Sequence, residues 1–309
     1  MVIPIRILLQ TTIPASEDDW NIERFSLLRG YLASLKDEAG NSLCEVTARN
    51  RESQADDPVL SNLDSSNFDE LWLFAVDIGG GLTEKECAAI TLFRQRGGGV
   101  LLARDHQDLG SCICYLDGIG AANFFHTRNQ DPDESRRCID DPYTTSISWP
   151  NYHSGSNGDY QTITAVEPTH ELLHNHSNAS GVIEFFPAHP HEGAVGVPTD
   201  AKNARAIAVG KSKITNRPFN LAVAFESAKD AHSNTIGRAV TESTFHHFCD
   251  YNWDTDMGCP SFVEEPPGDG IKREPRALED IKTYVRNIAL WLAPSRYDLS
   301  KKTSEELET

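Results

Sequence analysis

The stretch "FFPAHPHEGAVG", residues 185–196, places two histidines and a glutamate in a segment that has no lysine or arginine. Pro190 separates His189 from His191 and favours an extended backbone at His189. In an extended segment, side chains at positions i and i+2 point the same way, so both imidazoles can reach one metal ion. Glu192 then points elsewhere, which suits a proton acceptor or a group that orients a ligand.

Two further groups of polar residues follow predicted strands. Asp105 and His106 end the run "GGGVLLARDH", and His246 and His247 come after "GRAVTEST". Ligands of open α/β sheets bind beyond the carboxyl ends of the strands. We therefore expect imidazoles from three distant segments to meet above one edge of the sheet.

Such a meeting point predicts a divalent metal, zinc, iron or manganese, held with one open coordination position. The predicted ligands are imidazoles of the three segments: His106, His189, His191 and His246. The predicted catalytic residues are the other polar groups there: Asp105, Glu192 and His247. Asp105 or Glu192 is the expected general base, and the sequence leaves open which of His246 and His247 faces the site.

Each group also has a purely structural interpretation. A His-x-His pair in a loop can be surface polarity, and Asp105 is a good residue to cap a helix. Phe245 and Phe248 flank the His246–His247 pair, which favours a core histidine bonded to backbone. The alternative function is therefore a ligand-binding or assembly protein without catalysis. A metal-free acid/base enzyme that uses Asp105 with one of these histidines is a third possibility.

The first 120 residues alternate between predicted strands and helices. Apolar runs predict strands, and spaced apolar stripes predict helices. The expected strands are 3–12, 43–48, 70–77 and 100–105, and the expected helices are 16–40, 83–96 and a short one after 106. Thr83 and Glu86 form a capping box at the start of the second helix. This alternation predicts an α/β fold with a doubly wound, mostly parallel sheet of the flavodoxin type.

The periodicity is lost between residues 121 and 200, although aromatic residues remain frequent. We interpret this segment as a long, ordered, loop-rich excursion over the sheet edge, with Trp149 and Tyr152 walling the site. Regular elements return as predicted strands at 204–210, 219–226 and 236–244 and a last helix at 276–293. We expect one domain over 1–294 and a polar tail over 295–309.

Charge and composition limit the partners. Of the 309 residues, 46 are acidic and 28 are basic, which gives a net charge of −18. Such a surface repels phosphate backbones and anionic lipids, so we expect a small-molecule substrate and neither nucleic acid nor membrane. A homo-oligomer is left open. The seven cysteines are an odd number and no export signal is visible, which favours free thiols and a cytoplasmic location.

Two motifs, "GGGVLLARDH" and "GRAVTESTFHH", are similar to those of the class I glutamine-amidotransferase-like superfamily, in its trehalose-utilisation (ThuA-like) branch. The resemblance covers residues 1–294 and implies the class I amidotransferase-like form of the α/β fold. Members with glutaminase activity carry a cysteine nucleophile on the turn after the glycine-led strand, where this chain has Arg104, Asp105 and His106. We therefore expect a metal-assisted hydrolase or lyase for a small polar, carbohydrate-related substrate, and not a glutaminase.

Overall fold

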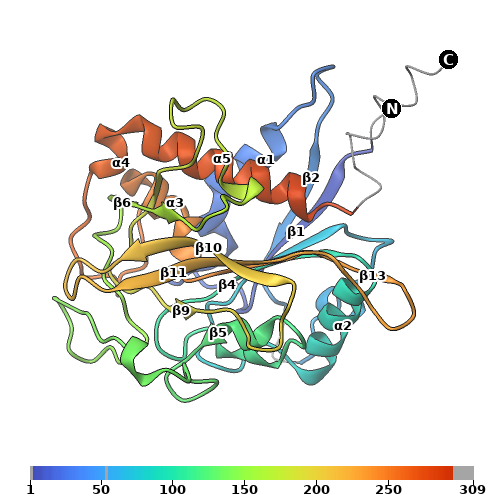
Figure 1. Cartoon of the computed structure of the whole chain (residues 1–309), viewed down its shortest axis with the longest axis horizontal. Helices are drawn as coiled ribbons and strands as arrows, with labels where there is room; N and C mark the ends of the chain where they lie inside the picture. Colours follow the sequence, from blue (N-terminus) through green and yellow to red (C-terminus); the bar gives the residue numbers. More distant parts are fainter. Residues whose placement is uncertain (1–2, 53–54, 295–309) are drawn as a thin grey trace.

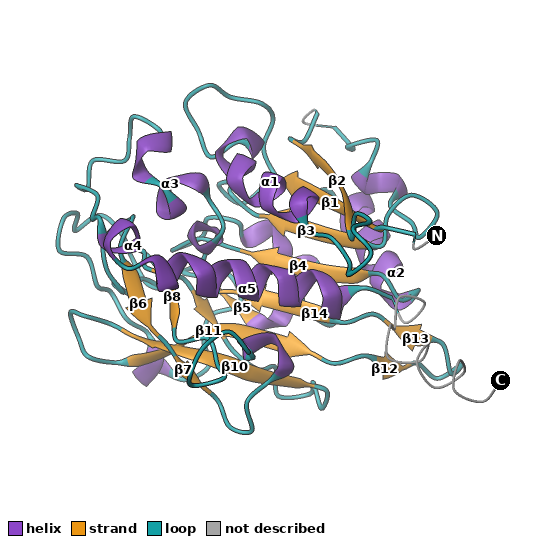
Figure 2. Cartoon of the chain, turned by 90° about the horizontal axis from the view of Figure 1, so that it is seen from above, coloured by secondary structure: helices purple, strands orange, loops and turns teal. Residues whose placement is uncertain are grey.

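The buried apolar runs form the middle of an eight-stranded, mostly parallel sheet, and the expected α/β fold is confirmed (Figure 2). The computed structural model describes residues 3–52 and 55–294, so the expected polar tail over 295–309 lies outside the described residues. The five parallel strands are, in spatial order, β2 (Cys44–Arg49), β1 (Ile5–Thr11), β3 (Glu70–Phe74), β4 (Gly99–Ala103) and β14 (Ala239–Glu242). The antiparallel extension is β11 (Pro218–Phe225), β10 (Ala204–Lys211) and β7 (Thr164–Ala165).

Short paired strands and helices complete the described part of the chain. The small sheets pair β5 (Asn123–Phe124) with β9 (Ala194–Val195), β6 (Tyr160–Thr162) with β8 (Phe185–Pro187), and β12 (Ala228–Lys229) with β13 (Thr235–Ile236). The helices are α1 (Ser26–Ser34), α2 (Glu84–Gln95), α3 (Asp250–Trp253), α4 (Gly270–Arg273) and α5 (Pro275–Leu292). None of the helices in this part of the chain is both long and apolar enough to cross a bilayer.

Helices cover both faces of the sheet, with α1 and α5 on one face and α2 on the other (Figure 1). Because strand side chains alternate between faces, Trp72 and Phe74 of β3 join the core under α1 and α5. Leu71 and Leu73 of the same strand join the core under α2. This two-sided burial explains why the central strands are continuously apolar in sequence.

Two of the three helices expected in the first 120 residues are shorter or of another type than expected. The capping box of Thr83 and Glu86 is present at the start of α2, as the sequence predicts. The helix expected over 16–40 is shorter, because a 3₁₀ turn at Ile22–Phe25 precedes α1 and Leu35 is already extended. The segment after His106 forms a 3₁₀ helix at Ser111–Tyr115 and no α-helix. Capping motifs and the spacing of apolar residues thus predict where a helix lies better than they predict the residues at which it begins and ends.

Asp280 of α5 fastens the excursion over 121–200 to the helix. Its fully buried carboxylate accepts hydrogen bonds from the side-chain amides of Asn175 and Asn178, both at Oδ1. Its other oxygen, Oδ2, accepts from the backbone N–H groups of Glu184 and Phe185 at 2.8 and 3.1 Å. One side chain therefore binds both the turn at residues 175–178 and the start of β8.

Replacing this carboxylate tests whether the excursion depends on α5. We expect Asp280→Ala to lower the free energy of unfolding by about 2–4 kcal/mol, because one buried and three partly buried donors lose their acceptor. Urea denaturation followed by fluorescence measures this change. Asp280→Asn keeps an acceptor oxygen and should cost less, and the exposed neighbour variant Glu279→Ala should stay within about 0.5 kcal/mol of wild type. An equal loss in Asp280→Ala and Glu279→Ala would contradict the proposed anchoring.

Candidate functional site

A cavity of about 700 Å³ lies beyond the carboxyl ends of β1, β3, β4 and β14. Residues that follow these strands line it, among them Trp20, Val76, Asp105, His106 and His246. The excursion adds His189 and His191 to the lining. The structure therefore brings the three histidine-bearing segments together at one edge of the sheet. β2 and β3 lie on opposite sides of β1, so this edge is also the topological switch point, where such sheets bind ligands.

Five of the lining residues form two overlapping groups that could each hold a metal ion. His106, His189 and His191 make one group, with ligand atoms all within 4.8 Å of one another. Asp105, His189 and His246 make the other group at the same separation. The four histidines predicted as ligands thus belong to these groups, and His189 is common to both.

Two asparagines fix how His189 and His246 face the cavity. The two rings stack with centroids 3.6 Å apart and planes at 11°. His189 Nδ1 lies 2.9 Å from Asn157 Oδ1, and His246 Nδ1 lies 3.3 Å from Asn252 Oδ1. Asn252 Nδ2 donates to Asn157 Oδ1 and to the backbone oxygen of Ala188, which sets the amide orientations. Since amide oxygens only accept, both Nδ1 atoms carry the proton and both Nε2 atoms keep a lone pair for a ligand.

The Nε2 atom of His189 is buried and makes no hydrogen bond to any described residue. Its nearest acidic neighbour is Asp105, whose Oδ1 lies 3.7 Å away. Burial lowers the pKa of His189 and of His191 to about 3, and it lowers the pKa of His246 well below the ordinary value. At neutral pH these imidazoles are uncharged, which is the form that binds metals.

Asp105 is a buried carboxylate held at the end of β4. Its Oδ1 accepts the backbone N–H of His106 at 2.8 Å and lies 3.2 Å from His106 Nδ1. Burial alone would raise the pKa of Asp105, but His106, His189 and His246 outweigh it and hold that pKa well below the usual range. Asp105 therefore offers a negative oxygen to the cavity at neutral pH.

Arg104 and Gly193 lock the excursion against the turn after β4. The Arg104 guanidinium is fully buried, lies over the Phe125 ring at 3.7 Å and donates to the backbone oxygens of Asp105, Gln107 and Phe124. Gly193 donates its N–H to Ser243 at 2.9 Å, and a Cβ there would lie 2.7 Å from the Asp105 oxygen. Only glycine fits at position 193, because the backbone of the histidine-bearing loop lies so close to the ends of the strands.

Glu192 and His247, both predicted as catalytic residues, do not line the cavity. They lie behind it, where His247 Nε2 is 3.4 Å from Glu192 Oε2 and His247 Nδ1 is 3.1 Å from Glu242 Oε2. Burial alone would lower the pKa of His247, but the two carboxylates raise it to about 9. The 3₁₀ turn Phe245–His247 points successive side chains apart, so His246 faces the cavity and His247 faces this buried network. Their positions do not support a direct catalytic role.

Two acidic residues near His191 were not singled out from the sequence. Asp141 Oδ2 lies 3.0 Å and Glu265 Oε1 lies 3.3 Å from His191 Nε2. Their segments, "CIDD" and "VEEPPGDG", contribute to the acidic composition, and nothing in their local pattern distinguishes them from solvated loops. Only the folded chain shows that both return to the same histidine.

The aromatic walls of the cavity also differ from those expected. Tyr152 is buried and stacks on Phe219 with centroids 4.6 Å apart, and buried Trp149 lies away from the cavity lining. The aromatic side chains that line the cavity are instead Trp20, Tyr143 and Phe262. The excursion supplies one of them, and the chain after β1 and the loop before α4 supply the others.

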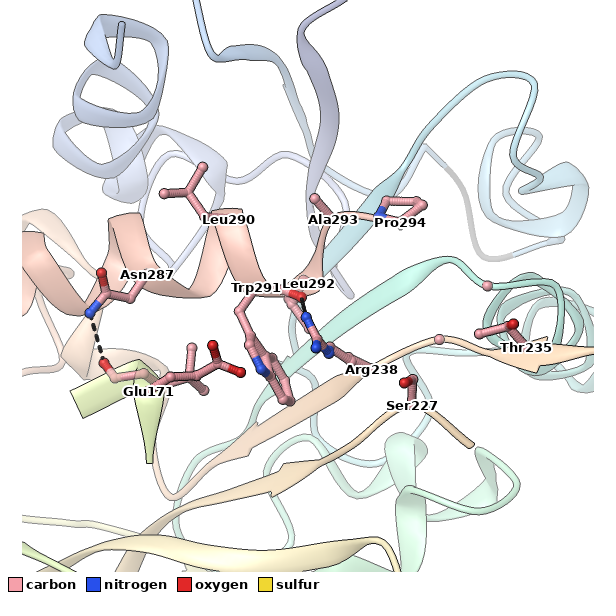
Figure 3. Close-up of a pocket in the computed structure, with 13 residues that line it drawn as sticks. Glu171, Ser227, Thr235, Arg238, Asn287, Leu290, Trp291, Leu292, Ala293 and Pro294 are labelled. Carbon is pink, nitrogen blue, oxygen red and sulfur yellow. Dashed lines mark hydrogen bonds between the residues drawn. The ribbon is translucent and has the colours of Figure 1, made fainter. Parts of the chain in front are cut away.

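A second cavity, of about 440 Å³, lies at the carboxyl end of α5 (Figure 3). Two of its polar side chains donate to backbone oxygens: Arg238 Nη1 to that of Trp291 at 2.9 Å, and Asn287 Nδ2 to that of Leu172 at 3.0 Å. Gly97 and Arg238, which line it, precede β4 and β14, so it lies at the amino ends of the strands. Position and chemistry both favour the histidine-lined cavity as the functional site.

No protein-family model matches this sequence, and no curated protein matches it. Among solved structures, the mmIFT52 N-terminal domain is similar, with 11% identity, a TM-score of 0.45 and coverage of 81% of this chain and 90% of that one. A ThuA-like protein from Parabacteroides merdae has 15% identity and a TM-score of 0.44, covering 78% of this chain and 79% of that one. The glutaminase domain of Trypanosoma brucei CTPS has 12% identity and a TM-score of 0.37, covering 95% of this chain and 98% of that one. The activity must therefore be argued from the residues of this chain.

The buried neutral imidazoles predict a pH dependence of stability. His189 and His191 have pKa values of about 3 when folded and about 6.5 when unfolded, so the unfolded chain binds more protons in that interval. In the presence of a chelator, we expect the free energy of unfolding to fall as pH drops from 6.5 towards 4. His189→Gln should lessen this slope by about 1 kcal/mol per pH unit.

Urea titrations at pH 4.5, 5.5 and 6.5 measure these slopes. The exposed His232 provides the control, because His232→Gln should leave the slope unchanged. If wild type and His189→Gln lose stability in parallel, the imidazole of His189 is not the neutral buried group described above.

Proposed function

We propose that this protein is a metal-assisted hydrolase or lyase whose ion binds at His189. The observation that supports this most directly is the buried Nε2 atom of His189, which lacks a hydrogen bond and faces a cavity shared with other potential ligands. Burying an unsatisfied polar atom is costly, so such atoms usually have a partner. A divalent cation would supply that partner.

Of the two ligand groups, Asp105, His189 and His246 fit the ion best. All three residues are at most 4% exposed, and Asn157 and Asn252 already orient the two imidazoles. Two imidazoles and one carboxylate suit zinc, iron or manganese and leave coordination positions open. His106, His189 and His191 are the alternative group, in which Asp105 would be free to act as the general base predicted from the sequence.

The chemistry supplied by such an ion is the activation of water, whose pKa falls to about 7 when a metal binds it. In the preferred arrangement His106 is the proton acceptor. Its side chain is 14% exposed at the cavity, and its Nδ1 lies 3.2 Å from Asp105, which orients the ring. A general base must lie within hydrogen-bond reach of the proton that it takes, and His106 lines the same cavity as the proposed ligands.

The lining of the cavity supports a neutral or cationic polar substrate. No lysine or arginine lines the cavity in the part of the chain that the structure describes. Four acidic residues line it: Asp19, Asp105, Glu264 and Glu265. An anionic substrate would be repelled by these carboxylates. Trp20, Tyr143 and Phe262 present aromatic surfaces that suit the apolar face of a sugar ring, in keeping with a carbohydrate-related substrate.

The proposal excludes glutaminase chemistry of the cysteine type. The turn after β4 carries Asp105 and His106, and the thiol nearest to His246 is Cys249, whose Sγ lies 3.6 Å from His246 Nδ1. This thiol is fully buried and donates to Asn252 Oδ1, and burial raises its pKa. A protonated thiol below the imidazole has no access to substrate. We retain the doubly wound, ThuA-like assignment of the scaffold as part of this proposal.

The alternative of a non-catalytic binding protein predicts histidines bonded to backbone with no cavity among them. His189 and His246 bond instead to the side chains of Asn157 and Asn252, and both line the cavity. This arrangement favours the catalytic proposal.

Elemental analysis of untagged protein tests the metal directly. We expect purified wild type to contain zinc, iron or manganese at about one ion per chain or more, and His189→Ala to lose at least tenfold in metal affinity because it belongs to both ligand groups. His232→Ala, at an exposed histidine, should keep the wild-type content. A metal-free wild type that still turns over a substrate would overturn the proposal.

Two further variants separate the ligand groups. His246→Ala should lower metal affinity strongly if Asp105, His189 and His246 hold the ion, whereas His106→Ala should then change it little. The reverse order of effects would assign the ion to His106, His189 and His191.

A further inference from the structure

We propose that the cavity binds a second divalent cation, held by His191, Asp141 and Glu265 beside the ion at His189. This inference rests on the proposed function, because it assigns the first ion to Asp105, His189 and His246 and so leaves His191 free for another. The outcome would be a two-ion centre, which the sequence did not predict.

His191 contacts two carboxylates that come from distant parts of the chain. Its Nε2 atom lies 3.0 Å from Asp141 Oδ2 and 3.3 Å from Glu265 Oε1. Although they are close, His191 Nε2 and Asp141 Oδ2 are not aligned as a hydrogen bond, and both are buried without a hydrogen-bond partner among the described residues. One imidazole nitrogen with an oxygen of each of two carboxylates within 3.3 Å of it offers the donor types that a divalent cation binds.

The loop that carries Asp141 presents its free oxygen to this point. Asp141 Oδ1 accepts the backbone N–H groups of Tyr143 and Thr144, each at 2.9 Å. These two bonds fix the carboxylate, whose side chain is 2% exposed, and leave Oδ2 directed at His191. A ligand held by hydrogen bonds to its second oxygen is typical of built metal sites.

The negative charge that lines the cavity or lies beside His191 also favours more than one cation. Asp105, Asp141 and Glu265 have side chains only 6%, 2% and 13% exposed, and no lysine or arginine lines the cavity within the described ranges. Burying carboxylates without compensation is strongly unfavourable. A single divalent cation would leave one of their three formal charges unbalanced, whereas two cations and one bound hydroxide would balance all three.

The two sites are adjacent through the histidine pair noted in the sequence. His189 and His191 have ring centroids 5.5 Å apart and planes at 82°, so each ring can serve a different ion. Neighbouring ions in such centres activate a water molecule and neutralise the charge that develops on the substrate. A two-ion centre therefore favours hydrolysis over a lyase reaction for the proposed enzyme.

Manganese binding to the full untagged chain tests the second site. After removal of metal with a chelator, equilibrium dialysis against Mn²⁺ with elemental analysis should give two ions per chain for wild type. Asp141→Asn and Glu265→Gln should each give one. Asparagine can still accept from Tyr143 and Thr144 with its oxygen, so Asp141→Asn should stay folded, which a thermal melt checks. Glu279→Gln, at an exposed position of α5 that does not line the cavity, is the control and should bind two.

The outcomes separate this inference from the proposed function. One ion in wild type, unchanged in both carboxamide variants and lost in His189→Ala, would overturn the second site and keep the first. Two ions in wild type, Asp141→Asn and Glu265→Gln alike would also overturn it, since the second ion would then lie elsewhere. No ion in wild type would overturn both proposals. If Asp141→Asn does not fold, the number of ions bound by Glu265→Gln alone tests the second site: one ion supports it and two ions overturn it.

Discussion

The site depends on the burial of uncharged imidazoles whose protons are held on the side away from the cavity. Asn157 and Asn252 accept the Nδ1 protons of His189 and His246, and the amide of Asn252 is itself fixed by the Ala188 backbone oxygen. Removal of these rings from water lowers their pKa values, so they remain neutral over the physiological range. Without the asparagine pair, either ring could turn its lone pair away from the cavity.

The fold supplies this arrangement by closing a loop-rich segment onto the carboxyl edge of a rigid sheet. The strands fix Asp105 and His246, whereas the excursion must be brought down to them and held. Arg104 does so from the strand side by binding three backbone oxygens, and Gly193 permits the closest approach. Asp280 anchors the far end of the excursion to α5. Residues with no contact to a substrate thus determine the separation between the potential ligands.

The sequence predicted the regular parts of this structure and only part of the site. Continuous apolar runs located the central strands, and the capping box located α2, because both signals are local. The i and i+2 spacing also correctly predicted that the side chains of His189 and His191 point to the same side, since both line the cavity. Asp141 and Glu265 could not be found in this way, because they lie 50 and 74 residues from His191 in loops whose composition is that of ordinary surface. The sequence could not separate His246 from His247 either, because a 3₁₀ turn decides which ring faces outward.

The donor atoms of the proposed centre differ between its two halves, and this difference bears on which ions it would accept. Asp105, His189 and His246 offer two nitrogens and one oxygen, a set that suits zinc or iron. His191, Asp141 and Glu265 offer one nitrogen and two oxygens, which shifts the preference towards harder ions such as manganese or magnesium. A centre of two identical ions would therefore favour manganese, since it accepts both donor sets. Unlike ions would place the stronger Lewis acid at the nitrogen-rich half, beside His106, where a water molecule could most readily lose its proton.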